Sequence, residues 1–486
     1  MTAEPEEATV ALAERPGGKR APAATRRDEP AATHVAADPA PPTHVAVVGA
    51  GLAGLAAALE LKRAGFRVTL LERSRLLGGK ATSFRLGDLE VDSGQHAILG
   101  CYTSFLDFAA ELGMGGDLHL QKRFEVLMLA ERGPHRLRAL RLPAPLHLAI
   151  PFLGFRGLSL PARLQVARAL LAARRHRPGE DEATFDGWLS RHHQGDQARR
   201  GFWEPFLVPA LNAPFDRVSA AAGLMVVRTA LLGDSRAARM GWATVPLGRF
   251  AERAAERCDE VRLRTPVTGL RVEDGRLRAV QAGDGEIAAD AAVLAVPPDR
   301  LLRFAGAEAL GIDGLDRFTT QPIVDVHLWY GSDAADGPAG SDPLPGVDFA
   351  ALTGSPVQWV FVKGPGHLCC SLSSADGLIS QPEDELVALA DAELRARLPA
   401  LGPATLRRGV AIRDPEATFV PAPGLRRPGP GTALPNAVVA GCWTDTGWPA
   451  TMEGAVRSGR AAAGALTASL AVGHDRARPA SVGGAP

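Results

Sequence analysis

The sequence predicts an α/β fold with a parallel-sheet domain, into which a second domain of mixed helices and strands is inserted. Three observations predict it. A strand–helix–strand unit with a glycine-rich turn occupies residues 44–72. A strand followed by a long helix occupies residues 436–470. Between them lie a mainly helical stretch, residues 100–250, and a mixed stretch, residues 320–420.

Both ends of the chain read as disordered tails. Residues 1–42 are rich in Ala, Pro, Glu and Arg, and they contain no apolar run of the kind that a signal peptide carries. Residues 476–486 form the second tail. We therefore expect order to begin near His44.

The first ordered unit has clear boundaries. His44–Val48 is a short apolar, β-branched run, which predicts a buried strand. Leu55–Arg63 is rich in Ala and Leu and predicts a helix, which Gly65 ends. Phe66–Glu72 predicts the second strand, so the whole is a βαβ unit.

The turn of this unit carries the motif Gly49-Ala50-Gly51-Leu52-Ala53-Gly54. Gly49 allows the tight turn, Gly51 lets the backbone approach a pyrophosphate, and Gly54 lets helix and strand pack closely. The helix N-terminus then stabilises negative charge. Glu72 follows where a carboxylate accepts hydrogen bonds from ribose hydroxyls, and it disfavours the 2′-phosphate of NADP. The unit therefore predicts a Rossmann-like dinucleotide-binding domain.

The remaining elements follow from periodicity and turn signals. Asp274-Gly275 predicts a hairpin turn. Helices are predicted at Gln165–Arg175, Ala251–Arg257, Glu383–Leu398 and Met452–Leu470. Strands are predicted at Val261–Leu263, Val267–Val272, Leu277–Gln281, Asp290–Val296, Ile323–Tyr330, Gln358–Val362, Leu368–Leu372 and Asn436–Ala440. We expect residues 43–115, 250–310 and 425–475 to form the cofactor domain, and residues 116–249 and 311–424 to form the substrate domain.

Composition excludes several classes of protein. The chain has 486 residues, with 54 Lys+Arg against 54 Asp+Glu, so no general basic field would attract nucleic acid. Its five cysteines form no C-x-x-C pair, which argues against a disulfide framework and a structural zinc site and fits a reducing cytoplasm. His327 and His367 have no companions at metal-ligand spacing, so we expect no metal.

The most apolar stretch, Leu142–Leu160, does not predict a transmembrane helix, because Pro143, Pro145 and Pro151 interrupt it. With Phe152 and Phe155 it predicts either a membrane-facing patch or a buried loop, with equal weight. Since the chain is neutral, we expect any peripheral contact with the inner face of the membrane to rest on apolar groups rather than on a basic surface.

A second glycine pair, Gly78-Gly79-Lys80, follows the second strand. This extension resembles the GG-doublet flavoproteins, which include amine oxidases, protoporphyrinogen oxidase and carotenoid desaturases. The segment from Ala440 to Gly459 resembles the flavin-end motif of the phytoene-desaturase branch. The resemblance implies an FAD-binding domain of the GG-doublet type with an inserted substrate domain of mixed helices and strands.

This resemblance also implies which residues contact FAD. They are the turn and strand residues Gly49, Ala50, Gly51, Leu52, Ala53, Gly54, Glu72, Arg73, Gly78, Gly79, Lys80, Gly94, Gln95, His96 and Val267, with Gly441, Cys442, Thr451 and Met452 at the flavin end. One departure stands out. Relatives carry an acidic residue at the position of Cys442, and a thiol cannot supply that charge. We expect Asp445 or water to substitute, or flavin affinity to be weaker.

Several segments are similar to a narrower branch, the hydroxysqualene dehydroxylases. They include Val91–Tyr102, Trp203–Pro205, Ala210–Pro214, Pro322–Tyr330, Gln358–Phe361 and Ala417–Phe419. The resemblance implies reductive removal of an allylic hydroxyl from an isoprenoid lipid, with the flavin's electron donor left open. A carotenoid desaturase is the alternative reaction, and a non-catalytic lipid-binding protein on the same scaffold is the alternative class.

Removing a hydroxyl requires a proton donor and an apolar tunnel. His96 and Asp445 are the candidate catalytic residues. A structural hydrogen bond explains His96 equally well, and capping of the last helix explains Asp445 better. Trp329, Trp359 and Trp448 are candidate tunnel residues, for which core packing is at least as good an explanation. Glu453 and Arg457 predict an ordinary i, i+4 ion pair.

Overall fold

A computed structural model describes residues 43–87, 89–130, 133–175, 183–283, 285–331, 344 and 346–477. The predicted N-terminal tail, residues 1–42, lies outside these ranges. The predicted C-terminal tail was placed from residue 476, but the last helix continues to Ala477, and residues 478–486 lie outside the described part.

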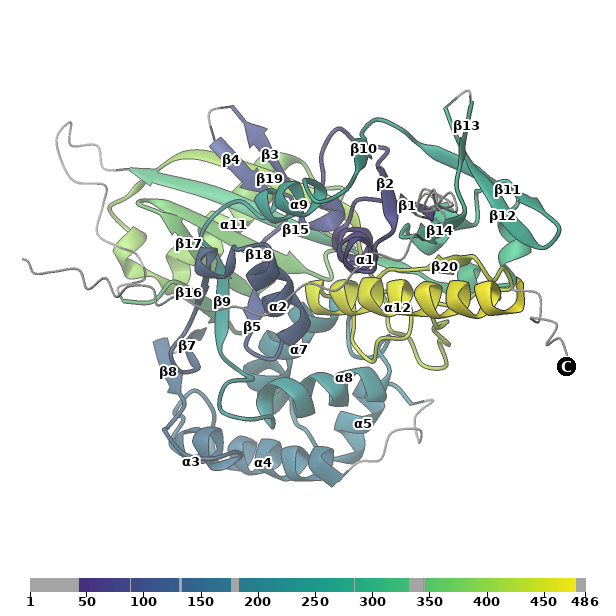
Figure 1. Cartoon of the computed structure of the whole chain (residues 1–486). Helices are drawn as coiled ribbons and strands as arrows, with labels where there is room; N and C mark the ends of the chain where they lie inside the picture. Colours follow the sequence, from purple (N-terminus) through teal and green to yellow (C-terminus); the bar gives the residue numbers. More distant parts are fainter. Residues whose placement is uncertain are drawn as a thin grey trace, which may run out of the picture. The chain divides into compact units, whose positions relative to one another are not determined.

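The centre of the cofactor domain is a five-stranded parallel sheet in the order β10-β2-β1-β14-β20 (Figure 1). Its strands are β1 (His44–Val48), β2 (Arg67–Leu71), β10 (Glu260–Arg262), β14 (Ala291–Leu294) and β20 (Ala437–Val439). Every neighbouring pair is parallel. The strands come from three separate parts of the chain, and the predicted α/β fold class is confirmed.

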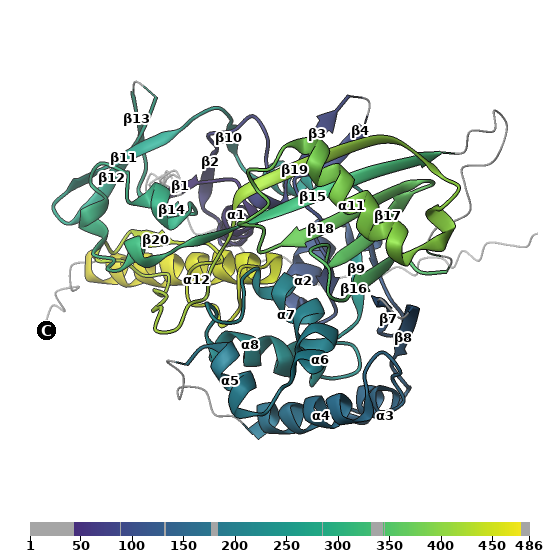
Figure 2. The same ribbon diagram turned by 180° about the vertical axis from the view of Figure 1, so that it is seen from behind.

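Two helices pack side by side on this sheet, α1 (Leu52–Arg63) and α12 (Met452–Ala477) (Figures 1 and 2). Their contact is close because it is lined by small residues. A Cβ on Gly459 would lie 2.0 Å from the carbonyl oxygen of Ala53. The first and last segments of the ordered chain are thereby joined in one core.

Smaller elements complete this half. They are β3 (Ser83–Leu86), β4 (Leu89–Asp92), α2 (Thr103–Glu111), α9 (Gly248–Ala255), β11 (Val267–Glu273), β12 (Arg276–Ala282), β13 (Gly285–Ala288) and α10 (Pro298–Leu301). The Asp274-Gly275 hairpin joins β11 to β12 as predicted.

The second large sheet has seven strands in the order β19-β15-β18-β17-β16-β7-β8. They are β7 (Glu125–Ala130), β8 (Gly133–Arg138), β15 (Thr320–Gly331), β16 (Phe349–Leu352), β17 (Trp359–Gly364), β18 (His367–Ser373) and β19 (Thr405–Phe419). One face packs on α11 (Glu383–Arg397) through Val324, Val326 and Leu328 of β15. Because side chains alternate along a strand, Asp325, His327 and Trp329 lie on the opposite face.

The helical part lies beyond this sheet, at the lower end of the unit in both views (Figures 1 and 2). It contains α3 (Leu146–Leu153), α4 (Leu160–Arg175), α5 (Phe185–Arg191), α6 (Asp196–Ala198), α7 (Glu204–Leu211) and α8 (Ala220–Val226). An aromatic core that includes Phe185, Trp188 and Trp203 holds these helices together.

Residues 100–250 are mainly helical, as expected, and they also contain the strands β6 (Leu118–Leu120), β7, β8 and β9 (Met240–Ala243), with β5 (Ile98–Leu99) just before them. One element was missed. The 15-residue β19 was not predicted at all. Its many Arg, Asp and Glu residues conceal an edge strand that pairs with β15 on one side only.

The described residues contain no helix that is long and apolar enough to cross a membrane. All five cysteines are free thiols.

Candidate cofactor site and reaction centre

The glycine-rich turn after β1 has the geometry that the motif predicts. Gly49 has φ +100°, and a Cβ there would lie 2.5 Å from the carbonyl oxygen of Ala295. A Cβ on Gly54 would lie 1.9 Å from the carbonyl oxygen of Gly49. Gly51 has free space, because a Cβ there would have only the Cα of Gly79 within 4 Å. Two glycines are therefore required by packing, and the third leaves a surface open to a ligand.

The turn leads directly into the N-terminus of α1. Gly51 is the N-cap residue and provides no side-chain cap, and the first turn of the helix contains no acidic residue. The first N–H groups of α1 are thus left for an anion, and the helix dipole adds to their attraction.

Glu72 follows β2 and is buried, with 8% of its surface exposed. Its Oε2 accepts the N–H of Ala50 at 2.9 Å, and its Oε1 accepts the N–H of Ser74 at 2.8 Å. Each carboxylate oxygen retains a lone pair, so the group can also accept hydrogen bonds from ribose hydroxyls. Glu72 therefore fixes the turn from the side at which an adenosine ribose would lie.

The GG doublet meets the first glycine motif. Gly78 and Gly79 have φ +101° and +61°, the N–H of Gly78 donates to the carbonyl of Ala50 at 2.9 Å, and Gly79 touches Gly51. Lys80, in contrast, pairs with Asp414 of β19 at 2.8 Å. Its charge is thereby partly neutralised within the protein. Arg73 is exposed and Val267 is half-buried at the start of β11.

The loop at the predicted flavin end, Gly441–Trp448, is organised by a residue that the sequence did not single out. Arg427 donates to the carbonyl oxygens of Cys442 at 2.7 Å, Trp443 at 3.2 Å and Trp448 at 2.6 Å. It also contacts the carbonyl of Thr444 and stacks over the ring of Phe419. Burial lowers the pKa of the Arg427 guanidinium, which still remains charged at neutral pH.

Thr451 and Met452 stand at the start of α12. The N–H of Gly454 donates to Oγ1 of Thr451 at 3.1 Å, so Thr451 caps the helix. The interpretation of Asp445 as that cap is wrong, because its carboxylate accepts the N–H of Gly447 and is exposed. Gly441 has φ +146°, and burial raises the pKa of the neighbouring Cys442 thiol.

The predicted acid Asp445 and the segment Gly94-Gln95-His96 are not brought together by any contact within the described residues. That segment instead meets the polar face of the seven-stranded sheet. The N–H of Gln95 donates to Oδ2 of Asp325 at 3.1 Å, and Nζ of Lys363 donates to Oε1 of Gln95 at 3.2 Å. Nδ1 of His96 donates to the carbonyl of Gly94 at 2.8 Å, which leaves Nε2 as the ring nitrogen that faces no described partner.

Asp325 is the most unusual group at this junction. It is 2% exposed, and its Oδ1 is buried without a hydrogen-bond partner in the described part of the chain. Burial raises the pKa of its carboxyl, and the nearby Ser371, His96 and Lys363 oppose that shift without cancelling it. A buried carboxyl of this kind favours its protonated form.

Two histidines share the same sheet face. Nδ1 of His327 lies 2.9 Å from Nε2 of His367, and His367 stacks on Trp329. Burial lowers the pKa of His327 to about 3 and that of His367 to about 4, so both are neutral at pH 7. No group of three or more His, Cys, Asp or Glu side chains able to hold a metal ion occurs in the described ranges.

The three predicted tunnel tryptophans lie in different surroundings. Trp359 is buried, donates from Nε1 to the carbonyl of Pro205 and packs with Phe349 and Phe361. Trp329 lies between His367 and Arg408. Trp448 contacts Tyr102 and Arg457, and Arg457 forms the predicted pair with Glu453 at 2.5 Å.

Sequence reasoning missed Asp325 and Arg427. A charged residue in the centre of the apolar strand 323–330 was a usable indication of Asp325, because an isolated carboxylate is costly to bury. Arg427 follows another arginine in a Pro- and Gly-rich segment, and nothing in that pattern distinguishes the two.

The residues present fit an adenine dinucleotide. Three features make the fit: the glycine cradle that a Cβ would fill, the uncapped N-terminus of α1 and the buried carboxylate of Glu72. The GG doublet extends this cradle, because Gly78 bonds to Ala50.

Comparisons with known proteins agree with this site. The family model for flavin containing amine oxidoreductase matches residues 52–467. A hydroxysqualene dehydroxylase of Rhodopseudomonas palustris is 30% identical over 87% of this chain and 98% of its own length. A 15-cis-phytoene desaturase of Synechococcus elongatus is 24% identical over 87% of this chain and 96% of its own length.

Among solved structures, a putative protoporphyrinogen oxidase from Exiguobacterium has a TM-score of 0.63. It is 19% identical and matches 89% of this chain and 99% of its own, which shows a shared fold. Because the family model matches residues 52–467, most of the chain, the protein belongs to the flavin-containing amine oxidoreductase family and is an FAD-dependent oxidoreductase.

Proposed function

We propose that this oxidoreductase removes the hydroxyl group of hydroxysqualene reductively and releases squalene. The hydroxysqualene dehydroxylase of Rhodopseudomonas palustris supports the substrate, since its identity to this chain exceeds that of the phytoene desaturase. The observation that carries the reaction type is the buried carboxyl of Asp325 next to Gly94-Gln95-His96.

The two reactions need opposite proton chemistry. A hydroxyl leaves an allylic carbon as water only if an acid protonates it, whereas desaturation removes a proton and needs a base. FAD, when bound in its reduced form, supplies the hydride and its electron pair. The chain must supply the proton, and a buried carboxyl with a raised pKa holds its proton to higher pH than an exposed carboxyl does.

The surrounding residues position that proton. The Gln95 N–H fixes Oδ2 of Asp325, which leaves Oδ1 to carry the proton toward the substrate. His96 is suited to orient the hydroxyl, because its Nδ1 is bound to the carbonyl of Gly94 and its Nε2 is left for a further contact. The assignment of the proton donor to Asp325 replaces the expectation that His96 or Asp445 would serve.

The same sheet face carries buried aromatic side chains. In the register of the sheet, Asp325 lies opposite Ser371 of β18, and Ser371 lies opposite Trp359 of β17. Trp359 and Phe361 then continue into the aromatic core with Phe349. We infer that the isoprenoid chain lies along these rings, with the hydroxyl-bearing carbon toward Asp325.

The test is conversion of hydroxysqualene by the purified, photoreduced FAD enzyme under anaerobic conditions, with squalene measured by mass spectrometry. Asp325→Asn should lower turnover by about 100- to 10,000-fold, as expected for loss of a general acid. It should leave the flavin absorbance spectrum and bound FAD content unchanged. A wild-type enzyme that retains FAD and forms no squalene overturns the reaction, and conversion of phytoene instead would establish the desaturase alternative.

The pH profile gives a second readout. The pKa of Asp325 is raised in the folded state, so its protonated form is present at low pH and is lost as pH rises through that pKa. Turnover should fall over the same interval. The stability that the protonated carboxyl contributes should fall there too, and Asp325→Asn should remove this part of the pH dependence of unfolding. An unchanged unfolding profile in the variant would contradict a titrating Asp325.

A further inference from the structure

One end of the substrate domain has an outer surface that the fold does not explain. The described residues include twelve large hydrophobic side chains that are exposed, and eight of them lie between Leu140 and Leu171. They are Leu140, Leu142, Leu146, Ile150, Leu153, Leu160, Leu164 and Leu171. Their gathering on one segment differs from the scattered exposure that is normal for a soluble protein.

Helical spacing places these side chains on outer faces. In α3, Leu146, Ile150 and Leu153 follow the i, i+4, i+7 pattern and are 47%, 47% and 51% exposed. The inner side of the same helix already contributes Phe152 to the core. The helix is therefore apolar on both sides, and only the inner side has a partner in the described chain.

This surface is also strongly basic. Residues 133–175 contain eight arginines and no Asp or Glu, although the whole chain is neutral. Arg136 and Arg138 pair with Glu125 on β7, but the exposed Arg156, Arg168 and Arg174 form no ion pair with a described residue. Apolar side chains surrounded by cations are the pattern of a helix that lies in the interface of an anionic bilayer.

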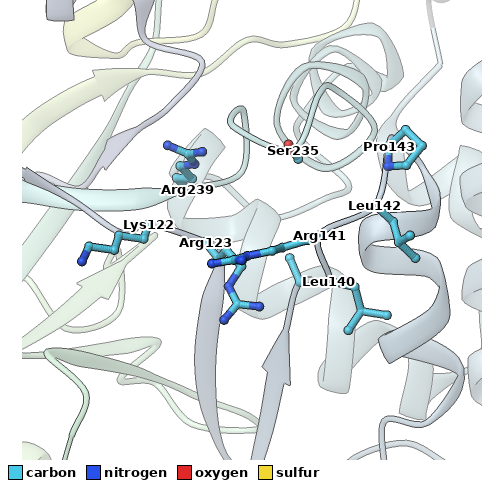
Figure 3. A pocket seen from close by; sticks show the side chains of 9 residues that line it. Lys122, Arg123, Leu140, Arg141, Leu142, Pro143, Ser235 and Arg239 are labelled. Atoms are coloured by element: carbon cyan, nitrogen blue, oxygen red, sulfur yellow. The ribbon is translucent and has the colours of Figure 1, made fainter.

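A cationic pocket of about 400 Å³ opens beside α3. Its lining includes Lys122, Arg123, Arg141 and Arg239 and contains no acidic residue. Figure 3 shows the side chains of Arg123 and Arg141 reaching into the middle of the pocket, with Arg239 on the far side and Leu140 and Leu142 at its edge.

The cations of this pocket have no internal counter-charge. None of the four forms an ion pair with a residue of the described ranges, and the buried Nε of Arg239 has no hydrogen-bond partner there. The neighbouring Asp234 accepts the N–H groups of Arg236 and Ala237 through its Oδ1 and forms no ion pair with a described residue. Like charges held together without a partner attract an anion, and a guanidinium fork matches the oxygens of a phosphate.

We propose that this surface docks the enzyme on a membrane, with the phosphate of an anionic phospholipid in the Lys122–Arg239 pocket and the leucines of α3 and α4 among the acyl chains. The occupant is a phospholipid rather than a free phosphate because the exposed leucines at the pocket's edge need an apolar phase next to the anion. This inference does not rest on the proposed reaction. It differs from the expectation that membrane contact would rest on apolar groups rather than on a basic surface.

The test is flotation of the full-length FAD enzyme with vesicles of phosphatidylcholine alone or with added phosphatidylglycerol. Binding should require phosphatidylglycerol and should weaken at high salt. Arg123→Gln with Arg141→Gln should weaken it by roughly 25-fold, at about fivefold for each cation. Ile150→Gln should weaken it by about tenfold through lost apolar insertion. The matched controls Arg257→Gln and Leu302→Gln change an exposed arginine and an exposed leucine elsewhere, and they should bind as the wild type does.

Inorganic phosphate separates the two sources of the anion. Binding of phosphate is measured by calorimetric titration. If phosphate bound tightly and this depended on Arg141, while the pocket variants bound vesicles as the wild type does, the pocket would be a site for a soluble anion. That result would overturn the proposal. Equal binding to both vesicle types would overturn it as well. Because vesicle binding is measured without substrate, its result can be interpreted even if the enzyme does not convert hydroxysqualene.

Discussion

The two halves of the cofactor site are held in shape in opposite ways. At the turn after β1, the backbone fits because side chains are absent, and Gly49 and Gly54 leave no room for a Cβ. At the flavin-end loop, the backbone is held by one large side chain, since Arg427 bonds several carbonyls between Cys442 and Trp448. The glycine packing is visible in the sequence as a repeated spacing, whereas the hydrogen-bond network of the loop depends on a single arginine.

The strongest test of the glycine packing at the turn after β1 is Gly54→Ala. Its Cβ would lie 1.9 Å from the carbonyl oxygen of Gly49, so the turn or α1 must move. We expect a loss of about 3 kcal/mol of unfolding free energy and loss of bound FAD, in line with severe overpacking. Chemical denaturation and flavin absorbance after gel filtration measure the two effects.

Gly464→Ala is the matched control for this prediction. Gly464 lies inside α12, and a Cβ added there would have nothing within 4 Å, so alanine should leave stability equal or raise it by roughly 0.5–1 kcal/mol. If Gly54→Ala retained FAD with wild-type affinity, the close packing of the turn would not be what shapes the phosphate site.

This contrast explains how far sequence reasoning reached. The glycine motifs, Glu72 and the strands around them were predicted because each depends on local spacing. Asp325 acts on Gln95, 230 residues away, and only the folded chain brings them together. Arg427 is nearer to its partners in the chain, but no spacing motif distinguishes it from Arg426. For the same reason β19 was missed, since its pairing with β15 rather than its composition makes it a strand.

The hydrogen-bond network of Arg427 is tested by Arg427→Ala. Removing the guanidinium leaves carbonyls of the loop without donors, and each buried, unpaired group costs about 1–3 kcal/mol. We expect an unfolding free energy lower by about 2 kcal/mol and weaker FAD binding, because water satisfies part of the loss at a half-buried site.

Arg427→Lys distinguishes charge from geometry. A lysine keeps the positive charge but not the planar fork, so it should recover less than half of the lost FAD affinity. Full recovery by lysine would mean that charge near the flavin end matters and that the network of carbonyl bonds does not. Fluorescence quenching of free FAD during reconstitution measures the affinity of both variants.

The smallest expected effect concerns Cys442, where the resemblance to the phytoene-desaturase branch implies an acid. The thiol lies in a positive setting, since the charges of Arg427 and Lys80 both oppose the rise in its pKa that burial causes. A carboxylate at this position would find compensating charge and could accept hydrogen bonds from the ribityl hydroxyls. Cys442→Asp should therefore tighten FAD binding by about tenfold, the contribution of one hydrogen bond to a charged group.

The control is Cys442→Ala, which should leave the affinity for FAD within a factor of two or three of the wild type. If the aspartate variant bound FAD more weakly and the alanine variant did not, the loop held by Arg427 would already bind the flavin end of FAD without an acid. The acid of the relatives would then be an alternative to the arginine network rather than an addition to it.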